Sequence, residues 1–123
     1  MKTPLQLVTE ALRSGKYKQG RHKLESDSDC SFCCLGVMCK VAQEQGISVS
    51  LNNRGILIGG NLFHQKEVVK WLKIKEYSGR FSKTCEIIKN TKVFSLTNLN
   101  DYGGFSFLEI ADFMEERKED LFE

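Results

Sequence analysis

The segment "CSFCCLGVMC", from Cys30 to Cys39, places four cysteines within ten residues. From its second half onward, apolar residues recur at helical spacing while Lys40, Gln43 and Glu44 fall on the opposite face. The apolar positions are Cys34, Leu35, Val37, Met38, Cys39, Val41 and Ala42. Because free cysteine packs as a small hydrophobe, we predict a helix over residues 34–45 and expect the cysteines of the chain to be reduced and buried in the core. Gly46 closes this helix, and Gly36 lets another backbone approach it closely.

Zinc binding, disulfide formation and a reactive thiol are the three alternatives to a core role for the cysteines. Cys30 and Cys33 have the C-x2-C spacing of a zinc site, and further ligands would come from Cys39, Cys85, His22 or His64. A second C-x2-C pair is missing, however, and adjacent ligands at Cys33 and Cys34 are unusual. Disulfides need an oxidising compartment, and a reactive thiol, best placed at Cys34, needs a cationic and partly exposed setting. We expect no metal and no cofactor.

The ends of the chain carry clear helix-capping signals. Thr3, Pro4 and Gln6 form a capping box with proline in the first turn, and Gly15 ends that helix. Ser106 and Glu109 form a second capping box before an apolar stripe. That stripe comprises Phe107, Ile110, Phe113 and Met114. A further helix is expected over residues 64–73.

Short β-rich runs account for much of the remainder. "ISVSL" and "GILIG" are separated by "NNRG", which indicates a hairpin, and "KVFSL" reads as a strand. "NLNDYGG" is typical of a turn. Strands without regular helical crossovers favour the α+β class. We predict a single domain over residues 1–123, with a small antiparallel sheet decorated by three to four helices.

Composition indicates a globular protein, with 41% apolar and 28% charged residues and one proline. No apolar run approaches the roughly 20 residues that a membrane span needs. The start "MKTPLQLVTEALRSG" is an amphipathic pattern, unlike a signal peptide. We therefore expect a cytoplasmic protein without membrane contact.

Charge is unevenly distributed along the chain, although the net charge is only +2. Residues 1–100 hold 16 Lys and Arg against 8 Asp and Glu, whereas residues 101–123 hold 2 against 8. The segment from Arg13 to Lys23 has five bases and no acid. Such a segment can meet phosphates, but it is equally explained as a solvated loop or as a basic arm facing the acidic tail of a neighbouring subunit.

No phosphate-binding loop, dinucleotide fingerprint, zinc-protease motif or nucleophile elbow is present, so an enzyme is not favoured. The most ligand-like segment is "LTNLNDYGGFSF", residues 96–107. Asn98 and Asn100 offer amides that can read a purine edge, and the helix after Ser106 offers free N–H groups to an anion. Aromatic faces for stacking come from Tyr102, Phe105 and Phe107. From residue types alone, a plain turn with Phe107 in the core remains the favoured explanation.

Three blocks of the sequence carry a family resemblance: "ALRSGKYKQGRHKL", "FCCLGVMCKVA" and "LTNLNDYGGFSFLEIADFMEE". Together they resemble a family of small phage and prophage proteins that includes Thoeris anti-defence protein 1. Residues 46–92 match no block of that family. Lys40 and Val41 replace an acidic–apolar pair that is common there.

The resemblance implies a non-enzymatic sponge with no catalytic residues. Members of that family bind cyclic ADP-ribose isomers made by bacterial TIR-domain proteins, and so keep the Thoeris effector switched off. The resemblance further implies a symmetric oligomer, a dimer or a dimer-based hexamer, with pockets between subunits. Some relatives also take cyclic oligonucleotides at a second site. The expected compartment is the cytoplasm of the infected bacterial host.

The chemistry of such a ligand suggests which residues would bind it. We predict that Arg21 and Arg54 hold the diphosphate, since arginine binds phosphate in a bidentate manner. Phe105 with Asn98 or Asn100 would hold the purine, and Asp101 would accept ribose hydroxyls. The alternatives are a small nucleic-acid-binding module, a protein inhibitor of a host factor, or a zinc- or thiol-dependent enzyme. With a net charge of +2 and an acidic C-terminal helix, no nucleic acid polymer is expected as a partner.

Overall fold

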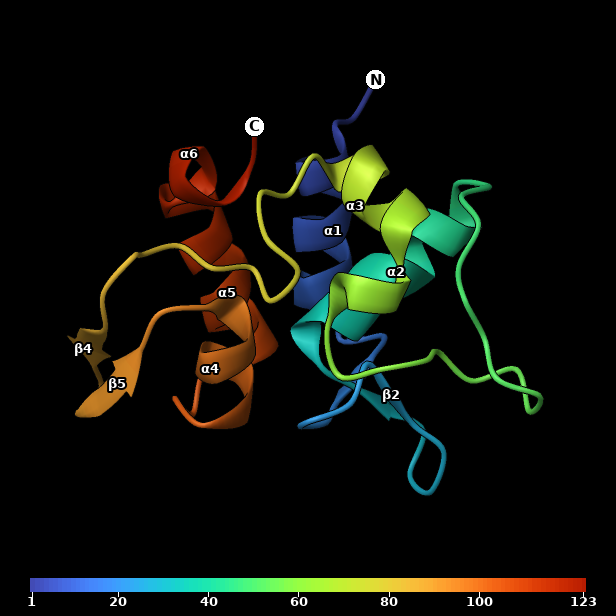
Figure 1. The fold of residues 1–123 in the computed structure, drawn as a ribbon, viewed down its shortest axis with the longest axis horizontal. Coiled ribbons are helices and arrows are strands. Elements are labelled where there is room, and N and C mark those ends of the chain that lie inside the picture. Colours follow the sequence, from blue (N-terminus) through green and yellow to red (C-terminus); the bar gives the residue numbers. More distant parts are fainter.

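The structure is a computed structural model that describes all residues 1–123, and it is a small single-domain α+β fold (Figure 1). It contains six α-helices, one 3-10 turn and five very short strands. The helices are α1 (Pro4–Arg13), α2 (Cys34–Glu44), α3 (Lys66–Leu72), α4 (Leu96–Asp101), α5 (Phe107–Glu116) and α6 (Lys118–Leu121), with η1 at Leu62–His64. The strands are β1 (Lys18–Gln19), β2 (Glu25–Ser26), β3 (Ser31–Phe32), β4 (Glu86–Ile88) and β5 (Thr91–Val93).

Helix α2 is the centre of the core, and the predicted cysteine-rich helix is confirmed. Eight of its 11 residues are buried, and it packs against α1, α3 and α4. In Figure 1, α1 lies between α5 on one side and α2 and α3 on the other. The close approach predicted at Gly36 is also present, because a Cβ there would overlap the carbonyl oxygen of Leu24.

Both predicted capping boxes are confirmed. Thr3 accepts a hydrogen bond from the Gln6 N–H while the Gln6 side chain accepts from Thr3 N–H, and Ser106 and Glu109 do the same for α5. The third helix is shorter than expected and spans Lys66–Leu72, because His64 ends η1 and Gln65 is the N-cap of α3. No helix of the structure has the length and apolar character needed to cross a membrane.

The β-structure differs from the predicted antiparallel sheet, and the helices are more numerous than expected. Strand β3 pairs parallel with β1 and antiparallel with β2, so the three-stranded sheet is mixed. The separate β4–β5 pair is antiparallel. "KVFSL" is only partly a strand, because β5 ends at Val93 and Ser95 becomes the N-cap of α4.

The hairpin predicted around "NNRG" is reduced to a single bridge between Leu51 and Leu57. The buried Gln65 side chain accepts a hydrogen bond from Ser50 N–H at 2.7 Å and donates one to Ser50 C=O at 2.9 Å. The Gln65 side chain therefore takes the Ser50 N–H, whereas the Ser50 carbonyl still accepts a bond from Ile58 N–H across the hairpin at 3.2 Å.

The predicted turn "NLNDYGG" is wrong for its first half. Ser95 caps a helix by accepting a hydrogen bond from Asn98 N–H, and α4 continues to Asp101 before Gly103 and Gly104 end it. In a helix, these polar side chains point toward different neighbours than they would in a surface loop.

Substituting Gly36 by alanine should destabilise the fold by roughly 2–3 kcal/mol, because the added methyl group collides with backbone that cannot rotate away. Urea unfolding followed by circular dichroism measures the change. Gln43→Ala, on the exposed face of the same helix, should stay within about 0.5 kcal/mol of the parent protein. Equal stability of the two variants would contradict the close approach.

Candidate functional site

The N-terminus of α2 lacks a cap of its own. Its N-cap residue, Cys33, makes no side-chain hydrogen bond to the helix. Instead Asn100, in α4, accepts a hydrogen bond from Cys34 N–H at 3.2 Å and another from the Gln19 side-chain amide at 2.9 Å. Its own amide donates to Gly20 C=O at 2.8 Å. Asn100 is only 1% exposed, so this side chain is a buried link between α2, α4 and the loop after β1.

Asp101 extends this network toward the surface. Its Oδ1 accepts hydrogen bonds from His22 N–H at 3.0 Å and from the Asn100 amide at 2.9 Å. Its Oδ2 lies 3.6 Å from His22 Nδ1 and takes no hydrogen bond. The Asp101 side chain is 3% exposed and that of His22 is 58% exposed. One carboxylate oxygen therefore accepts two hydrogen bonds, whereas the other forms none and lies beside the exposed side chain of His22.

The loop of residues 20–23 is thus fixed to the end of α4 by Asn100 and Asp101. His22 takes a left-handed conformation, with φ of 70°, and its ring lies 5.3 Å from that of Tyr102 in an edge arrangement. Tyr102 is 64% exposed. Arg21, between the two anchored residues, is exposed and forms no ion pair or hydrogen bond within the chain. We call Arg21, His22, Asp101 and Tyr102 the candidate site.

Two of the predicted binding residues, Asn98 and Phe105, make contacts within the chain. Asn98 accepts a hydrogen bond from Phe94 N–H at 3.0 Å through its side-chain oxygen. Phe105 is nearly buried, with the Lys89 ammonium 4.4 Å from its ring centroid and Phe113 packed edge-on. Neither side chain is free to meet a purine in this structure. Asn100 is likewise occupied by the backbone groups that it binds.

Arg54 lies in another part of the surface. It is exposed and pairs with Asp27 at 2.8 Å. Both line a shallow groove of about 660 Å³ between residues 23–27 and 52–59. Lys23, which directly follows His22, also lines this groove and is the link between it and the candidate site.

The predicted anion site at the start of α5 is already filled from within the chain. Ser106 and Glu109 cap the helix, and Lys89 pairs with Glu109 at 2.6 Å. His22 and Tyr102 were not among the predicted binding residues. Tyr102 offered an aromatic face in the sequence, but nothing local indicated that a histidine 80 residues earlier would lie beside it.

The cysteines divide into two groups. Cys33, Cys34 and Cys39 are buried as predicted, whereas Cys30 and Cys85 are exposed, so the expectation of an all-core set is wrong for these two. Burial raises the pKa of the Cys33 thiol to about 12. No group of three or more His, Cys, Asp or Glu side chains is placed to hold a metal ion.

Residues 3–118 match the model of a family described as a domain of unknown function, DUF8296. The chain belongs to the DUF8296 family. No curated protein and no solved structure matched the chain. The DUF8296 match spans every residue of the candidate site, together with the Asn100 network that positions it.

Alkylation of the native protein should modify two cysteines, Cys30 and Cys85, while the three core thiols stay intact because they are buried and protonated. Iodoacetamide at pH 8 followed by intact-mass and peptide mass spectrometry counts the adducts. In urea all five cysteines should react, which is the internal control. Modification of Cys33 in the native protein would contradict the burial.

Asn100→Ala should lower the free energy of unfolding by about 3 kcal/mol, because it leaves the Cys34 N–H and the Gly20 carbonyl buried without partners. Chemical denaturation measures this loss. Asn53→Ala removes an amide from an exposed loop position and should change stability by less than about 0.5 kcal/mol. A matching small effect at Asn100 would mean that the network contributes little.

Proposed function

We propose that this protein is a phage anti-defence protein that binds and sequesters a cyclic ADP-ribose isomer without cleaving it, and so blocks activation of a Thoeris effector. The observation that carries the proposal is the Oδ2 of Asp101, which forms no hydrogen bond although the side chain is only 3% exposed, and which lies 3.6 Å from Nδ1 of His22. The exposed ring of Tyr102 lies 5.3 Å from that of His22. The three-block family resemblance supplies the identity of the ligand, and the candidate site supplies chemistry that suits it.

Each part of such a ligand has a counterpart near Asp101. A ribose hydroxyl donates a hydrogen bond to the free carboxylate oxygen, and a bond to a charged acceptor is stronger than a neutral one. The Tyr102 ring offers a face to the purine. Arg21 and Lys23, on the same loop, bind the negatively charged diphosphate. This assignment keeps Arg21 and Asp101 from the sequence and replaces Phe105 with Tyr102.

A sponge has no turnover and must bind tightly. Capture of a nanomolar signal needs a dissociation constant near nanomolar, which corresponds to about −12 kcal/mol. Arg21, His22 and Tyr102 are exposed, so we propose that a second copy of the chain covers the candidate site in a dimer or a dimer-based hexamer. Tyr102 and Leu108 are both more than half exposed and offer apolar area for that contact. Arg54 would then reach the diphosphate from the second copy.

The alternative function is hydrolysis, which is favoured by the His22 and Asp101 pairing. A carboxylate beside an imidazole is the usual arrangement of a general base. The thiols nearest this pair, Cys33 and Cys34, are however buried, and burial raises the pKa of both, which makes them poor nucleophiles. Binding without turnover therefore fits these residues better.

Capture and release tests the proposal directly. The purified protein is incubated with a cyclic ADP-ribose isomer from an activated TIR protein, washed and heat-denatured, and the supernatant is analysed by mass spectrometry. Intact ligand is expected. Asp101→Asn and Tyr102→Ala should each weaken binding by about 10- to 100-fold while the fold is retained, since one loses the charged acceptor and the other the stacking face.

Lys92→Ala is the matched control, because Lys92 is exposed on β5 and should leave capture unchanged. Destruction of the ligand would replace the sponge with an enzyme. Absence of both binding and destruction would remove cyclic ADP-ribose isomers as the ligand and direct the search to cyclic oligonucleotides or a protein target.

A further inference from the structure

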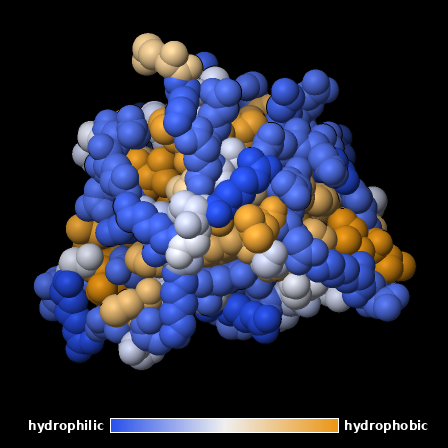
Figure 2. Space-filling view, turned by 180° about the vertical axis from the view of Figure 1, so that it is seen from behind, coloured by the Kyte–Doolittle hydropathy of each residue, from blue (hydrophilic) through white to orange (hydrophobic).

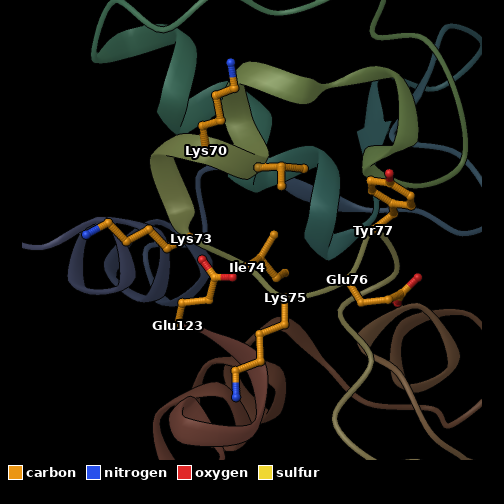
Figure 3. Close-up of a pocket in the computed structure, with 8 residues that line it drawn as sticks. Lys70, Lys73, Ile74, Lys75, Glu76, Tyr77 and Glu123 are labelled. Atoms are coloured by element: carbon orange, nitrogen blue, oxygen red, sulfur yellow. The ribbon is translucent and has the colours of Figure 1, made fainter.

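A second hollow lies away from the candidate site, beside the C-terminal end of α3 (Figure 3). It is a groove of about 860 Å³. Val69 and Ile74 contribute its apolar part, and Tyr77 stands at one side. The exposed Phe63 ring extends this side, with its centroid 5.2 Å from that of Tyr77. Figure 2, which shows the molecule from behind Figure 1, has apolar residues at the surface as separate patches among polar ones.

Lysines surround this groove rather than converge in it. Lys70, Lys73 and Lys75 all line it, but Figure 3 shows their side chains pointing in different directions. Glu76 and Glu123 also line the groove, and Glu123 points toward its middle. Three diverging cations and two carboxylates are a poor cradle for a phosphate group, which needs donors that meet at one point. Lys70 lies 3.5 Å from Glu67 and Lys75 donates a hydrogen bond to Glu119 C=O at 2.8 Å, whereas the Lys73 side chain has no such partner in the chain. Lys70 and Lys73, at the rim, suit a longer ligand with acidic groups spaced along it.

The backbone of Ile74 is an independent indication of a ligand. Ile74 forms an isolated antiparallel bridge with Phe122. Its hydrogen bonds are made by the neighbouring residues, from Lys75 N–H to Leu121 C=O at 2.9 Å and from Glu123 N–H to Lys73 C=O at 2.8 Å. In such a pair the N–H and C=O of Ile74 itself point away from the partner strand. Both groups lack a hydrogen-bond partner in the chain, although Ile74 is only 4% exposed.

We propose that this groove docks an extended peptide segment of a partner protein, with acidic residues on both sides of one large apolar residue. The peptide backbone pairs with the N–H and C=O of Ile74, which is strand addition in its smallest form. The apolar side chain packs on Val69 and Tyr77. The acidic residues meet Lys70 and Lys73 at the rim. This site is separate from the proposed nucleotide site and does not depend on it.

The test is fluorescence anisotropy with a fluorescein-labelled peptide in which aspartate and glutamate flank a single phenylalanine. Saturable binding is expected, weakening as salt rises because the lysine contacts are exposed. The double variant Lys70→Glu with Lys73→Glu should bind at least about tenfold more weakly. Lys92→Glu makes the same kind of charge change on β5 and should bind as the parent protein does. Circular dichroism confirms that the variants are folded.

Two further probes separate the proposal from simpler explanations. The same peptide N-methylated at the phenylalanine loses a backbone donor and should bind at least about tenfold more weakly. Displacement of the peptide by pyrophosphate or a single-stranded oligonucleotide at similar concentration would mean a phosphate site and overturn the proposal. Equal binding of the double variant and the Lys92 variant, equal binding of the methylated peptide, or no saturable binding of the peptide at all would overturn it as well.

Discussion

The rest of the structure depends on how the backbone N–H groups at the start of α2 find hydrogen-bond acceptors. A helix N-terminus presents backbone N–H groups that need acceptors, and this one lies in the core behind Cys33, which makes no side-chain cap. Asn100 supplies the acceptor from a helix 66 residues further along. Because the same amide binds Gly20 C=O, a single buried side chain ties α2, α4 and the loop after β1 together. Leaving these groups unpaired in the core is costly, so the three segments keep one relative arrangement.

Local signals in the sequence were sufficient wherever a structure is determined by neighbouring residues. The capping boxes at Thr3 and Ser106 and the close approach at Gly36 are of this kind. The helix α4 was not predictable in the same way, because its asparagines, aspartate and following glycines are also the residues of a turn. What selects the helix is the set of distant groups that Asn100 binds. Beside the 51–57 bridge, the Ser50 N–H is likewise bound from outside the hairpin, by the side chain of Gln65.

The candidate site, too, was predictable from the sequence only in part. Asp101 was recognisable as an acceptor, but only the fold reveals that one oxygen binds His22 N–H and that the other forms no hydrogen bond. Tyr102 and Phe105 are aromatic residues three positions apart and were equivalent as stacking candidates. They differ because Lys89, from the β4–β5 turn, covers the ring of Phe105 while Tyr102 remains exposed. Such distinctions depend on contacts between remote segments, which no spacing in the sequence records.

The position of Asp101 directly after Asn100 has a consequence for binding. The residue that would accept a ligand hydroxyl is held by the same helix end that completes the core, so its carboxylate is oriented before any ligand arrives. The His22 backbone is fixed by that carboxylate, and the loop bearing Arg21 is therefore ordered from both sides. A binder without turnover benefits from this arrangement, because ordering the site on binding would subtract from the affinity. Loss of Asn100 should accordingly affect the fold first and the ligand second, whereas a change at the free Asp101 oxygen should affect the ligand alone.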